Sequence, residues 1–263
     1  MCALTEVLWT DTTLHDEKSF YKRVLQHQHI LDTFRVNYSN TWHIPRLRIG
    51  GGETVRSLML TLDSKVPQQI ETAIDNGDGV TNYSTYQNPI RINSTSKLVV
   101  RSTYNQHQTI VSYPFEFSKA TNAKVNLITP GERSYANPGF TLVDGITGIF
   151  PWTGKHWIGW IGKSPEVKIE WTDKVKVDSI VVVYLHDPGS WIHAPASISY
   201  GESELLFESE KIVPVDPIER ISIPFYDEVN SIYLRFNSIG KNPEGTPGAG
   251  QNGWLFVSEI LVY

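Results

Sequence analysis

The chain has 263 residues, of which 40% are hydrophobic and 19% are charged, with a formal net charge of -5 at pH 7 and one cysteine, Cys2. This acidic balance argues against non-specific nucleic-acid binding, which needs a basic surface, and one cysteine cannot form an internal disulfide. No apolar run approaches the ~18 residues of a membrane-spanning helix, so we expect no transmembrane segment.

Residues 1–38 carry the helical part of the pattern. Their apolar residues recur at spacings of three and four, the period of an amphipathic helix. These residues are Leu4, Val7, Leu8, Phe20, Tyr21, Val24, Leu25, Ile30, Leu31 and Phe34. We expect Thr12 or Thr13 to cap the second of two helices, because Asp16 and Glu17 then lie in its first turn, where the helix dipole favours acids.

The beginning of the chain has no helix start signal. No N-cap residue precedes Leu4, and no charged segment followed by an apolar run indicates a signal peptide. We therefore expect the chain to be the C-terminal part of a longer protein. Two short helices cannot bury their apolar faces alone, so we expect residues 1–38 to pack on a preceding domain or to self-associate with a second copy.

Residues 46–117 change to the alternating pattern of β-strands. Strands are expected at 57–62, 90–92, 97–102 and 113–117. The intervening run Asp75-Asn76-Gly77-Asp78-Gly79 is typical of a turn. It does not match a calcium loop, because Gly77 stands where an EF-hand needs an acid or Asn.

Residues 118–263 continue as β structure with long loops rich in Gly, Pro and Trp. Strands are expected at 167–171, 177–185, 196–200, 220–224, 231–236 and 254–262. The chain is therefore expected to be mainly β. Three parts are predicted: a short helical part (1–45), a small β-sandwich (46–117) and an antiparallel β-sandwich (118–263).

Two segments in the first half carry a family resemblance. The run Ala3-Leu4-Thr5-Glu6-Val7-Leu8-Trp9-Thr10 and the segment 70–90, which includes Ile74-Asp75, resemble the C-terminal region of glycoside hydrolase family 20. That family contains the β-N-acetylhexosaminidases and chitobiases. The resemblance implies that residues 1–45 are the last part of a catalytic barrel and that residues 46–117 are a chitobiase C-terminal β-domain.

A second resemblance covers residues 118–263. It rests on Leu142-Val143-Asp144-Gly145, Trp157-Ile158-Gly159-Trp160, Trp191-Ile192-His193-Ala194-Pro195 and Trp254-Leu255-Phe256-Val257-Ser258-Glu259-Ile260. These segments resemble the discoidin-like sandwich (coagulation factor 5/8 type C), a galactose-binding-like jelly roll. In bacterial enzymes this fold often serves as a family 32 carbohydrate-binding module.

The family 20 resemblance implies a mechanism that the chain itself does not carry. In that family an adjacent Asp-Glu pair in the barrel catalyses hydrolysis. The Glu donates a proton to the leaving oxygen, and the Asp orients the acetamido group of the substrate. The pairs Asp16-Glu17 and Asp227-Glu228 lack the strand-end context and a Trp-lined pocket. We therefore predict no catalytic residue and no enzyme activity for this chain, and an extracytoplasmic parent glycosidase, whether periplasmic, cell-surface or secreted.

Carbohydrate-binding modules of this type bind sugars through loops at one end of the sandwich. An aromatic ring stacks on the apolar face of the sugar, and polar side chains bond its hydroxyls. The candidates are Trp191, Trp152, His193, His156 and Asn252. Trp157, Trp160 and Trp171 lie within strand patterns and are expected in the core. His193 is open to two interpretations, a ligand contact or a satisfied structural histidine.

The discoidin-like resemblance also implies a structural calcium ion. Its side-chain ligands would be an Asp in an Asp-Gly turn and a Glu on the final strand, which here are Asp144 and Glu259. Hard carboxylate and carbonyl oxygens suit Ca²⁺. The alternative is that Asp144 makes an Asx-turn and Glu259 is a solvated strand end. One departure is that Ile149 stands where many members of that family offer a hydroxyl.

These observations lead to one predicted function and one alternative. We predict a non-catalytic accessory region of a β-N-acetylhexosaminidase that binds weakly to a glycan containing N-acetylglucosamine or galactose. Weak binding in such a module raises the effective concentration of a tethered enzyme. The alternative is a purely structural module that packs on the catalytic barrel and binds no ligand.

Overall fold

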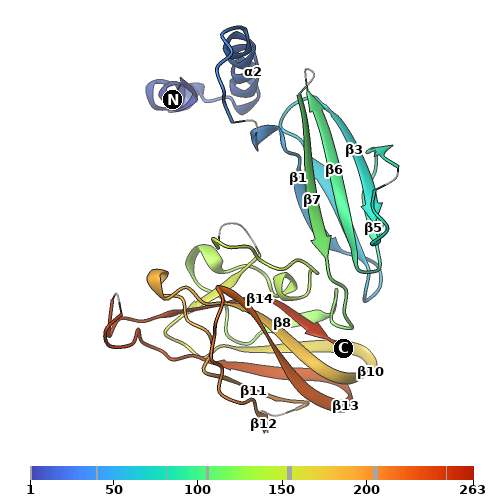
Figure 1. Ribbon diagram of the computed structural model, residues 1–263, viewed down its shortest axis with the longest axis vertical. Helices are drawn as coiled ribbons and strands as arrows, with labels where there is room; N and C mark the ends of the chain where they lie inside the picture. Colours follow the sequence, from blue (N-terminus) through green and yellow to red (C-terminus); the bar gives the residue numbers. More distant parts are fainter. Residues whose placement is uncertain are drawn as a thin grey trace. The chain divides into compact units, whose positions relative to one another are not determined.

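The computed structural model describes residues 2–39, 41–80, 82–104, 107–152, 156–203, 207–246 and 248–263 (Figure 1). Two compact units are present. The first comprises residues 1–48, 61–89 and 98–112, and the second comprises 49–60, 90–97 and 113–263. The structure is mainly antiparallel β, as predicted. The division into three domains stays a prediction.

The helices lie where the apolar period predicts them. Helix α1 spans Cys2–Trp9 and helix α2 spans Glu17–Thr33, with single 3₁₀ turns η1 (Thr12–Leu14) and η2 (Thr41–His43). In the described part of the chain, no helix has both the length and the apolar character of a membrane span.

The predicted cap of the second helix is wrong. Thr12 and Thr13 lie within η1, so their backbone is already part of a 3₁₀ turn. Asp16 is the N-cap of α2, and its carboxylate accepts hydrogen bonds from the backbone N–H groups of Lys18 and Ser19, each at 3.2 Å. The cap lies closer to the helix because a carboxylate in this position satisfies two orphan donors and also complements the dipole.

The helical segment keeps several large apolar side chains exposed. Leu8, Trp9 and Phe34 expose 71%, 86% and 74% of their surface. Packing on a preceding domain, or self-association through residues 1–38, requires apolar side chains that are exposed in this way. Both stay predictions.

Two small sheets are built from residues 46–115. One has the strand order β1-β2-β5, and the other has the order β4-β3-β6-β7. Their bounds are β1 Arg46–Gly51, β2 Leu58–Asp63, β3 Gln69–Asp75, β4 Ser84–Thr85, β5 Ile90–Ile92, β6 Ser96–Tyr104 and β7 His107–Phe115. The turn predicted after β3 is confirmed, because Asp75 Oδ1 accepts hydrogen bonds from the backbone N–H groups of Gly77 (2.9 Å) and Gly79 (3.0 Å).

The second unit contains a seven-stranded antiparallel sheet with the order β12-β11-β13-β10-β14-β9, in which β8 also pairs with β10. The strands are β8 Lys124–Leu127, β9 Ile158–Ile161, β10 Glu166–Leu185, β11 Ser197–Gly201, β12 Phe207–Glu208, β13 Ile218–Asn237 and β14 Trp254–Val262. Short 3₁₀ turns η3 (Arg133–Tyr135), η4 (Gly139–Leu142) and η5 (Pro188–Ser190) lie in the loops.

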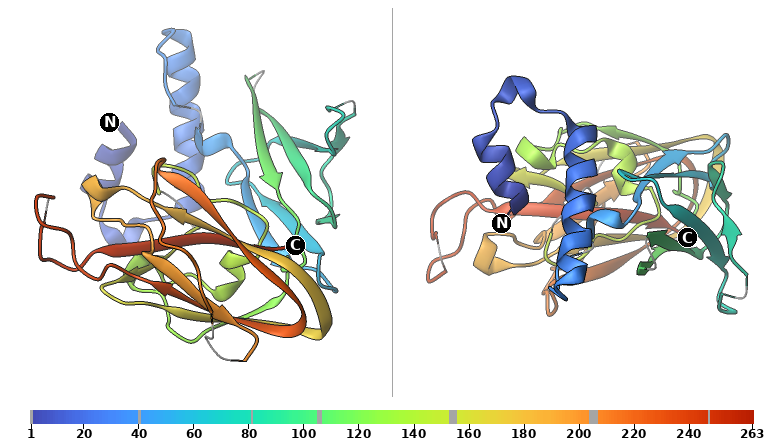
Figure 2. Two further views of the ribbon diagram at one scale, coloured as in Figure 1. Left: turned by 60° about the horizontal axis from the view of Figure 1, so that its bottom comes forward. Right: turned by 90° about the horizontal axis from the view of Figure 1, so that it is seen from above.

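Strands β10 and β13 are each 20 residues long and pair with one another almost throughout. Their register shifts between Glu170 and Val175 and again between Val177 and Ser179. The first half of β10 pairs with β8, and its second half pairs with β14. The sheet therefore curls over itself at the bulges, as Figures 1 and 2 show for the two long strands. The sequence pattern predicted two separate strands in each of these regions, because the bulges interrupt the alternation.

The curled sheet encloses the main hydrophobic core. Trp160, Trp171, Ile180, Leu234 and Val257 belong to it and are almost fully buried. Trp157 lies in a smaller cluster beneath the loops. The assignment of Trp157, Trp160 and Trp171 to the core is confirmed, and the indole N–H groups of Trp160 and Trp171 donate to the carbonyls of Thr129 (2.9 Å) and Lys119 (2.8 Å).

Candidate functional site

A pocket of about 400 Å³ lies among the loops at one end of the curled sheet. Its lining comes from η3, the end of β9, the residue after η5, the loop 241–252 and the start of β14. The lining residues are Arg133, Ile161, Trp191, Lys241, Gly250, Gln251, Asn252 and Trp254. Two tryptophans with several amides and cations form the mixed surface that is typical of a small-ligand site.

Trp191 is the exposed ring of this pocket. It has left-handed backbone dihedrals (φ 63°, ψ 24°), and 38% of its surface is accessible. The indole lies against Gly248, where a Cβ would come within 2.4 Å of the ring. Backbone hydrogen bonds hold the residue in place: Trp254 N–H donates to Trp191 C=O at 2.7 Å. A bulky side chain in left-handed backbone is costly and is frequently found at functional sites.

Asn242 organises the loop that carries half of the pocket. Its backbone N–H donates to Gln251 C=O (2.8 Å), and its C=O accepts from Gly250 N–H (3.0 Å). Its side-chain amide donates to Gly248 C=O at 3.0 Å. The remaining amide oxygen accepts from His193 Nε2 at 2.9 Å. One buried amide therefore ties the two ends of the loop together.

His193 is 6% exposed and does not line the pocket. Its ring Nε2 bonds Asn242, and its backbone N–H donates to Trp254 C=O at 2.8 Å. These contacts favour the structural interpretation of this histidine, in which it supports the loop rather than contacting a ligand.

The other predicted residues divide between the pocket and its surroundings. Asn252 lines the pocket and is exposed. Trp152 does not line it; its indole N–H donates to Tyr135 Oη at 2.9 Å, and Tyr135 packs edge-on against Trp254. His156 is half-buried outside the pocket, and burial lowers the pKa of its ring.

Sequence reasoning missed six of the eight lining residues, all except Trp191 and Asn252. Trp254 was expected to be packed, and it is partly buried with one side on the pocket. Lys241 and Gln251 lie in the Gly- and Pro-rich run 240–253, whose composition could have identified it as a binding loop. Arg133 carries no local signal, because only the tertiary fold brings η3 next to β14.

A second cluster surrounds Glu259 on β14. The register of β14 shifts between the partners Val183–Glu259 and Tyr184–Val257, which leaves Ser258 as a bulge. Core-facing residues are therefore Leu255 and Val257 before the bulge and Ile260 and Val262 after it. Two consecutive polar side chains, Ser258 and Glu259, consequently lie off the core face.

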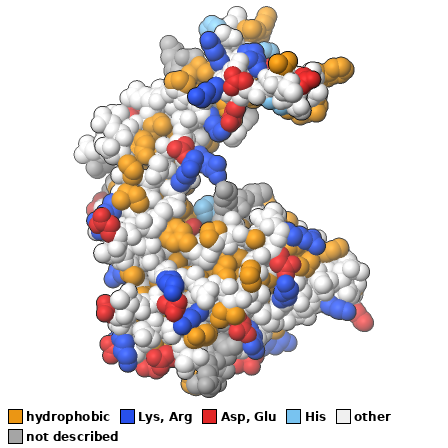
Figure 3. All heavy atoms as spheres, turned by 180° about the vertical axis from the view of Figure 1, so that it is seen from behind, with side chains coloured by type: hydrophobic (Ala, Val, Ile, Leu, Met, Phe, Trp, Pro, Cys, Tyr) orange, Lys and Arg blue, Asp and Glu red, His pale blue; other side chains and the backbone are white. Residues whose placement is uncertain are grey.

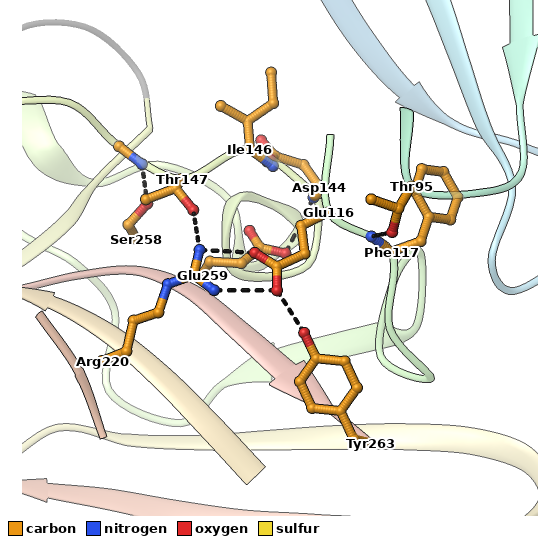
Figure 4. A network of polar contacts seen from close by, with 12 residues as sticks. Thr95, Glu116, Phe117, Asp144, Ile146, Thr147, Arg220, Ser258, Glu259 and Tyr263 are labelled. Carbon is orange, nitrogen blue, oxygen red and sulfur yellow. Dashed lines mark hydrogen bonds and ion pairs between the residues drawn. The ribbon is translucent and has the colours of Figure 1, made fainter. Parts of the chain in front are cut away.

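Both side chains hold the loop that follows Asp144. Gly145 N–H donates to Glu259 Oε1 at 3.0 Å, and Gly148 N–H donates to Ser258 Oγ at 2.5 Å. Asp144 Oδ1 accepts from Ile146 N–H at 2.9 Å, which is the Asx-turn named as the alternative above. Figure 4 shows this network together with Glu116 and Arg220.

The predicted pair, Asp144 and Glu259, is buried and mutually repulsive. Asp144 is 6% exposed and Glu259 is 1% exposed, so Glu259 is not the solvated strand end of the alternative interpretation. Burial raises the pKa of Asp144 to about 7. Burial and the charge of Asp144 together raise the pKa of Glu259 well above its usual range.

The residues present fit a bound cation. Within the described part of the chain, Glu259 Oε2 is buried without a hydrogen-bond partner. The nearby guanidinium of Arg220 is already engaged, since it bonds Glu116 at 2.7 Å and Thr147 Oγ1 at 3.3 Å. That hydrogen bond to Arg220 lowers the pKa of Glu116. Among the described residues no group of three acidic, His or Cys side chains forms a metal cluster, so carbonyl oxygens would have to complete the ligand set.

The two Asp-Glu dipeptides do not resemble a catalytic pair in space. Asp16 caps α2, and Glu17 forms an ion pair with Lys65. Asp227 and Glu228 lie at an open hollow with Tyr226, and Asp227 Oδ1 accepts from Glu228 N–H at 2.7 Å.

A larger hollow of about 530 Å³ lies along β13 and the segment 208–213. It contains Tyr184 and Tyr200 but no tryptophan. Its two basic residues are Lys211 and Arg220, and Arg220 is held by Glu116. We place the candidate site at the smaller pocket because its aromatic ring is exposed and its polar groups are free to face a ligand.

We predict that His193→Ala lowers the free energy of unfolding by about 1–3 kcal/mol, because it leaves the buried amide oxygen of Asn242 without a donor. Urea denaturation measures this loss. The control is Asn252→Ala, at an exposed position next to the same loop. Its free energy of unfolding should stay within about 0.5 kcal/mol of that of the unsubstituted chain. Equal effects of the two substitutions would contradict the supporting role of His193.

No protein-family model matches the sequence, and no curated protein matches it. Solved structures that align with part of the chain include carbohydrate-binding modules. A fucose-binding module of Streptococcus pneumoniae is 12% identical, with a TM-score of 0.37 over 55% of this chain and 95% of that chain. A chitosan-binding module of a chitosanase/glucanase from Paenibacillus sp. IK-5 is 9% identical (TM-score 0.36, 56% and 99% covered). The family 32 module of Clostridium perfringens NanJ, in complex with galactose, is 11% identical (TM-score 0.32, 53% and 91% covered). Similarity at this level does not transfer the ligands of these modules to this chain.

Proposed function

We propose that this chain binds carbohydrate through the pocket lined by Trp191, Trp254 and Asn252. The observation that carries the proposal is the exposed indole of Trp191, held in left-handed backbone above a pocket with amide groups. A flat ring covers the apolar C–H face of a sugar, and the amides of Asn252 and Gln251 bond its hydroxyls. A single shallow site of this kind binds weakly and is useful when it is tethered to another domain.

The wider assignment rests on the sequence resemblance. We propose that the chain is an accessory region of a β-N-acetylhexosaminidase that acts outside the cytoplasm. Its glycan would contain N-acetylglucosamine or galactose. The competing function is a structural module that binds no ligand, and sugar binding separates the two.

We also propose that Asp144 and Glu259 hold a structural Ca²⁺ ion. The buried, unpartnered oxygen of Glu259 and the raised pKa of Asp144 support the proposal, because a cation removes the cost of burying two like charges. Bound calcium would supply only charge neutralisation and oxygen coordination. The chain itself contributes the β14 bulge that places Glu259 beneath the loop of Asp144.

We predict that Trp191→Ala lowers the affinity for sugars at least tenfold, because exposed aromatic anchors contribute most of the binding energy of such a site. NMR titration with N-acetylglucosamine, galactose and their β-linked disaccharides measures it. Tyr226→Ala is the matched control, since Tyr226 is also exposed (78%) and also has left-handed backbone (φ 48°). Loss of affinity in both variants, or in neither, contradicts the assignment of Trp191.

The calcium proposal predicts a pH-dependent stability. Without calcium, the folded protein keeps a proton on Asp144 up to about pH 7, whereas in the unfolded chain the group ionises near 3.8. The thermal midpoint in EDTA should therefore fall as the pH rises from about 4 to 7, the interval between these two pKa values. Added Ca²⁺ should raise the midpoint more at about pH 8, where Asp144 is ionised in the folded protein, than at about pH 5.

Asp144→Asn tests both parts of this prediction. It should reduce the fall in midpoint over that pH interval, to which the raised pKa of Glu259 also contributes, and abolish the response to Ca²⁺. Asp173→Asn, at an exposed position on β10, is the control and should change neither. If the thermal midpoint of the unsubstituted chain is the same in Ca²⁺ and in EDTA at pH 8, the calcium proposal is wrong.

We predict no turnover of nitrophenyl N-acetyl-β-glucosaminide by the purified chain, because neither Asp-Glu dipeptide lies in a Trp-lined pocket. Release of nitrophenol is the readout. Turnover that disappears in Glu228→Gln would show that the exposed pair on β13 is catalytic after all.

A further inference from the structure

We infer that the pocket of Trp191 selects sugars that carry an anionic group, a carboxylate or a sulfate ester. The inference rests on the proposed function and concerns the class of its ligand. It is carried by the charge of the pocket: of the described residues that line it, two are cationic, Arg133 and Lys241, and none is acidic. On an acidic chain with a net charge of -5, this is a local reversal of sign.

Both cations lack an acidic partner among the described residues. Among the described residues no ion pair or side-chain hydrogen bond engages Arg133, and its guanidinium carbon lies 5.6 Å from the ring centroid of Trp254. The backbone of Lys241 pairs with Asn252. In the same part of the chain its ammonium group has no ion-pair partner. By contrast, most other basic groups on this unit are paired, for example Arg235 with Glu166 and Lys124 with Glu170.

The acids nearest in sequence form other ion pairs or are not among the lining residues. Glu132, directly before Arg133, forms an ion pair with Lys163 at 2.6 Å. Glu244 is exposed on the same loop as Lys241, and Asp187 precedes η5, and neither lines the pocket. On the face drawn in Figure 3, basic and acidic side chains of this unit are interspersed. The pocket differs from this face because the charged residues described in its lining are all basic.

The arrangement suits an acidic sugar for a physical reason. Trp191 and Trp254 offer apolar surface to the ring, and Arg133 is held over Trp254 with its N–H donors free. A guanidinium binds carboxylate or sulfate oxygens through charge-assisted hydrogen bonds, which are stronger than neutral ones. Lys241 adds a second positive charge from the opposite loop. A neutral sugar would leave both charges uncompensated at the pocket wall.

The test compares sugars that differ only at C6: galactose, galacturonic acid and galactose 6-sulfate, titrated into the full chain and followed by NMR. We expect both acidic sugars to bind about tenfold more tightly than galactose at about 20 mM salt. The preference should shrink as salt screens the exposed charges. If only one acid is preferred, the proposal holds for that anionic group alone.

Substitutions of the two basic residues test whether they cause the preference for acidic sugars. Lys241→Gln and Arg133→Gln should each reduce the ratio of acidic to neutral affinity severalfold, and the double variant should bring it close to one. Lys174→Gln removes one positive charge from an exposed position on β10 that does not line the pocket and should leave the ratio unchanged. Thermal unfolding verifies that each variant is folded.

The outcomes separate this inference from the proposed function. Equal affinity for galactose and both acids, lost in Trp191→Ala, overturns the anionic preference and leaves carbohydrate binding standing. A preference that survives the double variant also overturns it. The absence of binding to every sugar overturns carbohydrate binding itself, and the inference with it.

Discussion

The antiparallel pairing of β10 with β13 is the constraint on which the second unit depends. Two strands of 20 residues would extend ~66 Å if they were flat, far longer than a small domain can use. The register shifts after Glu170 and Val177 bend the ribbon, so that one continuous pair of strands supplies both layers around the core. Short strands then add to each half, β8 to one and β14 to the other.

The curled sheet positions both candidate sites. The loops after η5 and before β14 meet where the curled sheet leaves its end open, and there Trp191, Trp254 and the loop around Asn242 form a pocket. Far along β14, a bulge at Ser258 changes the facing of successive side chains. It turns Glu259 away from the core and under the loop of Asp144. Each site uses an irregularity that a regular strand or turn would not provide.

The two sites differ in how they treat charge. At Asp144 and Glu259, burial places two acidic groups together, and among the described residues Glu259 Oε2 has no hydrogen-bond partner, so protonation of these groups stabilises the folded state. At the pocket, Arg133 and Lys241 are exposed to solvent, where a charged side chain costs little free energy. In our proposals the first site therefore contributes to stability, and the second to ligand recognition.

Several elements of the chain could be predicted from the sequence, because the residue pattern that indicates each of them is local. The apolar period defined α2, the alternation defined most strands, and the tryptophans of β9 and β10 were recognised as core because they lie within strand patterns. The cap at Asp16 was missed because Thr and Asp are both good caps and only the backbone decides between them. The continuity of β10 and β13 was missed because bulges break the period of two.

The sequence by itself determined the mainly β class, the helical beginning and the core tryptophans, since each follows from residue type and near neighbours. The candidates Trp191, Asn252, Asp144 and Glu259 came from the resemblance of residues 118–263 to a discoidin-like sandwich. Only the tertiary structure decided that His193 supports Asn242 instead of facing the pocket, and that Glu259 is buried against Asp144. It also brought Arg133 and Lys241 to one pocket, although more than a hundred positions separate them in the chain. The physical reason is that long-range strand pairing sets these distances, and the local sequence pattern does not indicate which distant segments pair.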